Sequence, residues 1–151
     1  MHRVVVTGVG VISALGKNTA GFWESLVAGT SAIQQIESID VSQIRFKNAA
    51  EIRNYVPEEH LDAKDIPFMD RFAQFAVIAA REAIANAGIE WTPALRENTT
   101  VVTGSCLGGR GTEETGYWEL FHNNKNRVHP LTIPLSMSNA GASHKIGRAH
   151  V

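Results

Sequence analysis

Two short runs of β-branched residues predict strands buried inside a sheet. Residues 3–9 and 99–103 are rich in valine and threonine, and a glycine lies at or just after the end of each run. An almost continuous run of this kind, without strict alternation of apolar and polar positions, is typical of a strand covered on both faces in a parallel sheet. A shorter third strand is predicted within residues 46–52.

A long amphipathic pattern predicts the clearest helix, which begins after Asp70 and ends near Ala87. Aspartate is a favourable N-cap, and Gly88 marks the end of the pattern. The apolar positions recur at helical spacing, and they are Phe72, Phe75, Ala76, Ala79, Ala80, Ala83, Ile84 and Ala87. Most of them are alanine, which lets a neighbouring backbone come close, so we expect this helix to be deeply packed.

The remaining pattern alternates further helices with turns. It predicts a helix over 20–28 capped by Asn18 or Thr19 and ended by Gly29, a helix over 111–121, a loop over 123–134 and a helix over 136–144. Strands that alternate with helices across short glycine turns indicate an α/β fold with helices on the faces of a sheet. One domain, or part of one, spans residues 1–144.

Composition and charge exclude several classes of function. The chain has 151 residues, 44% hydrophobic and 19% charged, with a net charge of −1, so neither nucleic acid nor an anionic membrane surface is an expected partner. No apolar run approaches the roughly 18 residues that span a bilayer. A single cysteine cannot form an internal disulfide and fits a reducing compartment. We therefore expect a cytoplasmic protein.

The glycine turn that follows the first β-branched run, residues 3–9, is a candidate nucleotide-binding site. A dinucleotide fingerprint needs a third glycine where Ser13 stands, and an acidic residue after a second strand about 20 residues on. Asp40 lies too far along the chain to serve. A nicotinamide cofactor is therefore disfavoured, although it stays as the weakest of three hypotheses. The histidines lack metal-ligand spacing, so we expect neither a cofactor nor a metal.

The second glycine turn, residues 104–109, carries the lone cysteine, Cys106. A cysteine between a strand and a glycine loop could be a nucleophile, but a small buried side chain at a crowded turn is the more frequent role. A phosphate-binding P-loop is excluded, because no Gly-Lys-Ser/Thr follows. Taken without any family, the residues indicate an α/β domain without a complete catalytic set.

Six ordered motifs resemble the N-terminal half of the β-ketoacyl-acyl-carrier-protein synthases, nearest their type II branch. The motifs are the Arg3–Ser13 start with Gly16, the Trp23–Gly29 stretch with Ser31 and Ile33, the Met69–Ala76 segment, the Ala83–Gly88 segment, the Gly104–Gly109 turn, and Pro134–His144 through Met137, Asn139 and Ala142. No single motif is specific, but their order over residues 3–144 is.

The resemblance implies a thiolase-like layered α-β-α fold, of which this chain is the incomplete N-terminal half. It implies acyl transfer with decarboxylating Claisen condensation on malonyl-acyl-carrier protein, in a homodimer. The family's nucleophilic cysteine and two histidines lie beyond residue 144, so no catalytic residue is expected here and the chain alone should be inactive. Cys106 matches a variable position, and Leu107 matches a position that borders the acyl-chain pocket.

Two features leave the family role open. Many members carry several basic residues just before the Met69 motif, where they meet the acidic carrier protein, whereas here the stretch is Lys64-Asp65-Ile66-Pro67-Phe68. The catalytic position also lies outside the chain. A non-catalytic partner resembling a chain-length factor therefore stays as the second hypothesis.

The family pattern stops at Lys145. Residues 146–151 are the ones that a widely used sequencing adapter encodes, so we expect residues 145–151 to be a non-native tail. Arg148 and His150 then carry no functional weight.

Overall fold

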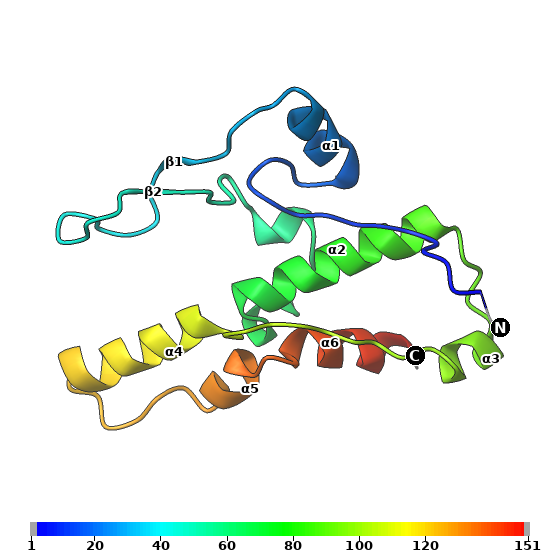
Figure 1. The fold of residues 1–151 in the computed structure, drawn as a ribbon. Coiled ribbons are helices and arrows are strands. Elements are labelled where there is room, and N and C mark those ends of the chain that lie inside the picture. Colours follow the sequence, from blue (N-terminus) through cyan, green and yellow to red (C-terminus); the bar gives the residue numbers. More distant parts are fainter. Residues whose placement is uncertain (1–2, 150–151) are drawn as a thin grey trace. The chain divides into compact units, whose positions relative to one another are not determined.

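The computed structural model describes residues 3–149, with side chains described as far as His144. The chain divides into two compact units, Met1–Val56 with Ile78–Gly88, and Pro57–Val77 with Ile89–Val151. The long helix α2 (Arg71–Ala87) contributes its first turns to the second unit and its remaining turns to the first. Figure 1 traces these elements in chain order.

Helix α1 (Thr19–Val27) in the first unit forms where the sequence predicts it. The side-chain oxygen of Asn18 accepts a hydrogen bond of 2.8 Å from the Gly21 N–H, which satisfies a donor that the first helical turn leaves unpaired. Gly29 follows the helix with φ +66°, a conformation that favours glycine. Both predicted boundary signals are confirmed.

A small antiparallel pair follows helix α1. Strand β1 (Gln34–Gln35) pairs with strand β2 (Asn48–Ala49), with Gln34 opposite Ala49. The strand predicted over residues 46–52 is thus correct in place but shorter than expected. Arg53 ties the pair together, because its guanidinium donates to the Gln34 side chain at 2.5 Å and forms an ion pair of 3.1 Å with Glu37.

The two predicted buried strands are wrong in this structure. Residues 3–9 and 99–103 are not paired in a sheet with any residue that the structure describes. Their valines lie open, with Val4 95% and Val102 89% exposed. A parallel strand is stable only when neighbours complete its hydrogen-bond ladder and cover both faces. No such neighbour is present among the described residues.

The close approach of other backbone segments to the alanines of helix α2 is confirmed, but the predicted deep burial of its apolar face is wrong. The buried residues of the helix are Ala73, Gln74 and Val77, whereas the members of the predicted face are half-buried. Gly10 lies so close to the helix that an added Cβ would overlap backbone atoms of Ala79 and Ala83, and Gly8 meets Ala83 in the same way. In the second unit, Gly141 approaches Ala76, and an added Cβ would lie 3.1 Å from the alanine methyl. Alanine and glycine thus allow backbone segments to pack directly on this helix.

The buried apolar side chains that the structure describes lie in the second unit. They are Leu61, Met69, Ala73, Val77 and Ala140. Two short 3₁₀ turns, η1 (Pro57–Glu59) and η2 (Ile66–Phe68), lead into helix α2. Asp70 caps that helix as predicted, since its carboxylate accepts a hydrogen bond of 3.1 Å from the Phe72 N–H, and Gly88 ends it with φ +60°.

The C-terminal helices differ from the predicted ones at their boundaries. Helix α3 (Pro93–Glu97) was not predicted, although Thr92 caps it and proline begins it. Helix α4 (Arg110–Tyr117) continues into a π-helical turn, η3 (Trp118–His122), close to the predicted 111–121. Helix α5 (Thr132–Ser136) and helix α6 (Ala140–Ala149) replace the single helix predicted over 136–144.

The predicted loop over 123–134 ends three residues early, because helix α5 begins at Thr132 and includes Pro134. Its missing N–H costs nothing there, since the first-turn donors of a helix have no partner within it. None of the described helices is long and apolar enough to cross a bilayer. Residues 150 and 151 of the expected tail lie outside the described residues, as do the side chains of 145–149.

Candidate functional site

The Gly104–Gly109 turn is held firmly at its glycine end. The Gly108 N–H donates to the Ser105 hydroxyl at 2.9 Å, and the Gly109 N–H donates to the Ser136 carbonyl at 3.0 Å. Gly108 has φ +60°, and a Cβ at either glycine would overlap the backbone of residues 135–136. Glycine at both positions therefore lets the turn lie directly against helix α5.

The tip of this turn is open. Cys106 is exposed, and Leu107 is 66% exposed. The interpretation of Cys106 as a small buried residue is therefore wrong in this structure, since the turn projects away from the packed core. The assignment of Leu107 as a wall of the acyl pocket stays a prediction.

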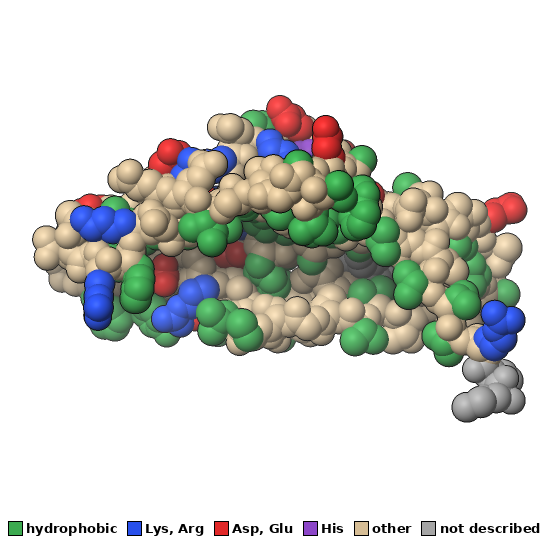
Figure 2. Space-filling view, turned by 45° about the horizontal axis from the view of Figure 1, so that its top comes forward, with side chains coloured by type: hydrophobic (Ala, Val, Ile, Leu, Met, Phe, Trp, Pro, Cys, Tyr) green, Lys and Arg blue, Asp and Glu red, His purple; other side chains and the backbone are tan. Residues whose placement is uncertain are grey.

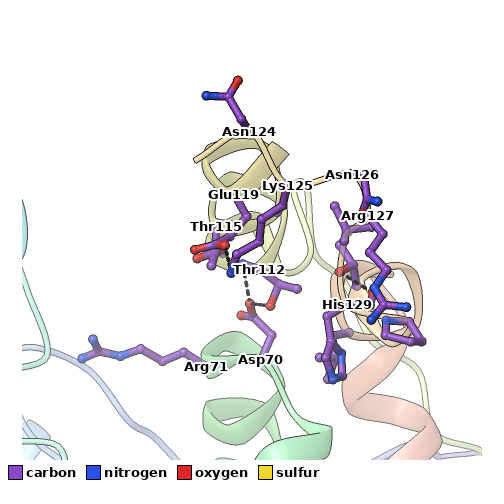
Figure 3. A pocket seen from close by; sticks show the side chains of 16 residues that line it. Asp70, Arg71, Thr112, Thr115, Glu119, Asn124, Lys125, Asn126, Arg127 and His129 are labelled. Atoms are coloured by element: carbon purple, nitrogen blue, oxygen red, sulfur yellow. Dashed lines mark hydrogen bonds and ion pairs between the residues drawn. The ribbon is translucent and has the colours of Figure 1, made fainter. Parts of the chain in front are cut away.

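Asp70 caps two helices with one carboxylate. One oxygen accepts the Phe72 N–H of helix α2, and the other accepts both the Thr112 N–H at 3.1 Å and the Thr112 hydroxyl at 2.5 Å. Both helix N-termini carry partial positive charge, which favours a carboxylate between them. In Figure 3 Asp70 points toward Thr112, while Arg71 points away from that pair.

A cavity of about 1200 Å³ opens beside this bridge, between helix α4 and the loop that follows it. Its charged side chains are Asp70, Glu119, Arg71, Lys125 and Arg127, and His129 also lines it. Lys125 forms an ion pair and a hydrogen bond with Glu119, and that hydrogen bond holds the pKa of the Glu119 carboxyl below its ordinary value. Arg127 makes no ion pair with any residue that the structure describes. The rim of the cavity is therefore cationic on balance.

Residues 124–130, within the segment predicted as a polar loop, contribute most of the basic rim. The stretch just before Met69, residues 64–68, has few basic residues, since Lys64 is the lone one there. Arg127 and His129 lie far along the chain from Arg71, and the fold of the second unit brings all three to one cavity (Figure 3). Only the tertiary contacts between helices α2, α4 and α5 reveal this grouping.

In the first unit, Glu82 occupies the backbone donors that a phosphate would need. Its carboxylate accepts the Thr19 N–H at the start of helix α1 at 2.7 Å and the Val11 N–H in the glycine turn at 2.8 Å. The hydrogen bond from Thr19, followed by the one from Val11, lowers the pKa of Glu82 although partial desolvation opposes them. A nucleotide phosphate at this helix N-terminus would have to displace a carboxylate.

Three of the described histidines have contacts that account for their rings. His144 Nε2 lies 2.8 Å from the Phe68 carbonyl, and His129 Nδ1 accepts the Leu131 N–H at 3.2 Å. His122 stacks on Trp118, with ring centroids 3.9 Å apart. Within residues 3–144 no three His, Cys, Asp or Glu side chains gather in a way that could hold a metal ion.

Two adjacent acidic residues on helix α4 form ion pairs within that helix. Glu113 and Glu114 pair with Arg110, at 3.1 Å and 3.6 Å, one turn away on the same helix. Such ion pairs on a solvated surface contribute little to stability. Glu113 and Glu114 are therefore not candidates for a catalytic role.

The amino-acid sequence matches the family described as "Beta-ketoacyl synthase, N-terminal domain" over residues 1–146. Curated relatives agree with this match. The chain is 35% identical over 133 residues to 3-oxoacyl-[acyl-carrier-protein] synthase 2 of Staphylococcus aureus strain COL, covering 88% of this chain and 32% of the relative. It is 36% identical over 138 residues to the synthase of the same name from Coxiella burnetii, covering 91% and 33%.

Solved structures share the fold. The ishigamide ketosynthase/chain length factor superposes with a TM-score of 0.78 at 22% identity, over 96% of this chain and 36% of that chain. A β-ketoacyl synthase from Burkholderia phymatum STM815 gives a TM-score of 0.76 at 22% identity, over 99% and 37%. The fold class that the resemblance implies is thereby confirmed.

The chain spans about a third of the length of the curated relatives it matches. The family match nevertheless covers nearly all of the chain, and it includes both glycine turns and the Asp70 bridge. This chain belongs to the β-ketoacyl synthase family and corresponds to part of its N-terminal domain.

Proposed function

We propose that the whole protein joins an acyl group to malonyl-acyl-carrier protein. The acyl group passes from its carrier thioester to a cysteine thiolate, which releases the carrier thiol. The malonyl group then loses carbon dioxide, and the resulting carbanion attacks the acyl carbonyl and expels the cysteine thiolate. The match to the β-ketoacyl synthase N-terminal domain over residues 1–146 carries this proposal, supported by relatives named 3-oxoacyl-[acyl-carrier-protein] synthase 2.

The 151-residue chain supplies scaffold for this reaction but no catalytic residue. Its single cysteine, Cys106, lies in an exposed turn and not in the Thr-Ala-Cys turn of the family. We expect the chain alone to show no condensation, no decarboxylation of malonyl-carrier protein and no acyl-cysteine. Mass spectrometry after incubation with acyl-carrier protein, together with a carbon dioxide release assay, tests this. Condensation product, released carbon dioxide or acyl-cysteine above the level of a Cys106→Ala control would overturn this expectation.

We propose an acyl carrier protein as the partner, docked on the basic rim of the cavity. A ketosynthase of similar fold, with a TM-score of 0.69 at 15% identity over 97% of this chain and 39% of that chain, was solved in complex with its type II polyketide acyl-carrier protein. In this chain Arg127 is exposed and free of ion pairs among the described residues. Such a cation suits an acidic partner.

Charge reversal tests the docking surface. Arg127→Glu should weaken binding of a fluorescent carrier protein by several-fold at low salt, whereas Lys47→Glu in the first unit should leave it unchanged, because a rim charge acts through complementary potential. Added salt should narrow the difference, since exposed charges are screened within about 10 Å at 0.1 M. Equal binding by both variants would rule out this surface.

We also propose Leu107 as a wall of the acyl-chain pocket in the complete protein. The support is its place at the open tip of the Gly104–Gly109 turn and its match to the family position. In the complete synthase, Leu107→Phe should shift product chain length downward and Leu107→Ala should shift it upward, as read by mass spectrometry. Cys106→Ser provides the neighbouring control, and an identical product profile for all variants would remove Leu107 from the pocket.

A non-catalytic role resembling a chain-length factor is the second candidate. The observation that favours it is the similarity to the ishigamide ketosynthase/chain length factor. The nucleotide sequence downstream of the His144 codon decides between the two roles. A Thr-Ala-Cys turn there supports a working enzyme, and a substituted cysteine supports the non-catalytic partner. In either case we propose a dimer in the cytoplasm.

We propose that residues 146–151, with part of the Lys145 codon, are a translated sequencing adapter. The family match ends at residue 146, which supports a break near that point. Resequencing the source DNA across these codons tests the proposal directly. Codons that differ from the adapter would overturn it, and residues 145–151 would then be native.

A further inference from the structure

Helix α4 begins at a residue that cannot cap it. Its N-cap is Gly109, which has no side chain to accept a hydrogen bond from the first-turn N–H groups. The missing acceptor is supplied from another element, because Asp70 accepts both the N–H and the hydroxyl of Thr112. Thr112 is the third residue of the helix, the position that a side-chain cap normally serves.

Glycine at position 109 makes this arrangement possible. A Cβ there would lie 3.0 Å from the Asp70 side-chain carbon and would overlap the backbone at Leu135. The turn, the carboxylate and helix α5 are therefore in direct contact around one residue. Any movement of Asp70 would reach the turn through Gly109 and Thr112.

The other end of the turn has no comparable anchor. Nothing lies within 4 Å of the position that a Cβ on Gly104 would take. Among the described residues, the tip is restrained by the internal bond from Gly108 to Ser105. The stem is held by the Gly109–Ser136 bond, the bond from the Arg110 N–H to the Gly108 carbonyl and the Asp70–Thr112 bridge. The position of Leu107 thus depends on how firmly the stem is held.

We infer that Asp70 is a positioning residue, which fixes the stem of the Gly104–Gly109 turn and thereby the location of Leu107. Its consequence for acyl-chain length rests on the proposed function of Leu107, whereas the positioning itself does not. Asp70 touches no substrate in this role and acts through Thr112. Its carboxylate is suited to the task because one group serves the N-termini of two helices.

The single cysteine of the chain reports on the turn directly. Cys106 is exposed beside Leu107, so a nitroxide spin label can be attached there alone, and its spectrum measures nanosecond motion of the tip. In the unsubstituted chain we expect a restricted spectrum. The measurement needs no carrier protein or acyl group, so a failure of the proposed function leaves it unaffected.

Four variants separate positioning from general stability. Asp70→Ser keeps a good cap for helix α2 but is too short to reach Thr112, and Thr112→Val removes the hydroxyl while keeping the shape. Both should shift the spectrum toward a faster component, with helical circular dichroism retained. Thr112→Ser restores the hydroxyl and should restore the restricted spectrum. Thr115→Val is the matched control, because its hydroxyl bonds within helix α4, to the Gly111 carbonyl.

An unchanged spectrum in Thr112→Val, or an equal shift in Thr115→Val, would overturn the inference. If Asp70→Ser loses helical structure, the contrast between valine and serine at position 112 still decides the outcome.

Discussion

At the scale of single residues, a carboxylate can hold two backbone segments together when it meets unpaired N–H groups. Glu82 does so in the first unit. It lies on helix α2 and accepts hydrogen bonds from the start of helix α1 and from the glycine turn at Val11. A neighbouring side chain, Asn86, accepts the Val9 N–H at 3.1 Å. Two polar side chains one helical turn apart therefore hold the segment that the sequence predicts as the end of a strand.

The lowered pKa of Glu82 gives a pH dependence with a definite sign. The group binds its proton less readily in the folded chain than in the unfolded chain, where its ordinary pKa is 4.5. Its contribution to the free energy of unfolding is therefore complete above pH 4.5 and is lost as the pH falls through the lower folded value. Denaturant titrations at about pH 7 and about pH 3 should show this loss.

Substitution isolates the Glu82 contribution. Glu82→Gln places an amide donor against backbone donors, so it should destabilise the chain near neutral pH and flatten the pH dependence. Glu24→Gln, on an exposed position of helix α1, should leave both unchanged. A pH profile that is the same with glutamine at position 82 would show that other carboxylates cause the acid sensitivity.

At the scale of elements, the small-residue face of helix α2 determines what can pack on it. Asp70 and Gly88 set the ends of this helix, so the amino-acid sequence alone predicts its bounds well. Its buried face is predicted less well, because Ala73, Gln74 and Val77 lie outside the predicted apolar set. The bounds of helix α1 are predicted as well as those of helix α2, because Asn18 and Gly29 act through local backbone geometry. These signals depend on a few neighbouring residues and need no knowledge of the rest of the fold.

Gly10→Ala should be strongly destabilising. The added methyl group would overlap backbone atoms of Ala79 and Ala83, which cannot move without displacing helix α2. Overpacking of this kind typically costs about 1–3 kcal/mol, which should appear as a lower denaturation midpoint. Gly104→Ala is the matched control, because its Cβ would point into open space. A cost that is equal at both positions would mean that the close approach is unimportant.

Other boundaries could not be predicted from local signals. A proline reads as a helix breaker in most contexts, yet Pro134 lies in the first turn of helix α5, where its missing N–H is harmless. The π-helical turn Trp118–His122 likewise has no simple sequence signature. Its exposed aromatic rings stack in pairs, at 6.2 Å for Tyr117 and Phe121.

At the scale of the whole molecule, the main feature is apolar surface that lies exposed to solvent. Val4, Val6 and Val102 are each more than four-fifths exposed, and they belong to segments with unpaired backbone groups. Figure 2 shows hydrophobic side chains gathered on the visible surface. Unpaired strand segments with apolar side chains recruit further strands.

We expect the 151-residue chain to self-associate as its concentration rises. Sedimentation velocity over a concentration series should show growth of larger species, because pairing would bury the exposed valines. Val4→Lys together with Val102→Lys should reduce this association, since charges on unpaired edges oppose strand pairing. Lys substitution at Ile133, which is exposed on helix α5 and not in a strand segment, is the control. A chain that stays monomeric throughout would contradict the expectation.

The amino-acid sequence by itself determined the family, the long helix α2, the caps of helix α1 and the glycine turn that bears Leu107. Each depends on residues close together in the chain or on the order of motifs along it. Only the tertiary structure decided that Asp70 serves two helices, that Glu82 holds the first glycine turn, and that Arg127 and His129 share a cavity with Arg71. These groupings join residues dozens of positions apart, and hydrogen-bond partners at that separation follow from packing and not from local pattern. For the same reason the valine runs, which are predicted as buried strands, stay unpaired here, because a sheet forms only where neighbouring strands are present to complete its hydrogen bonds.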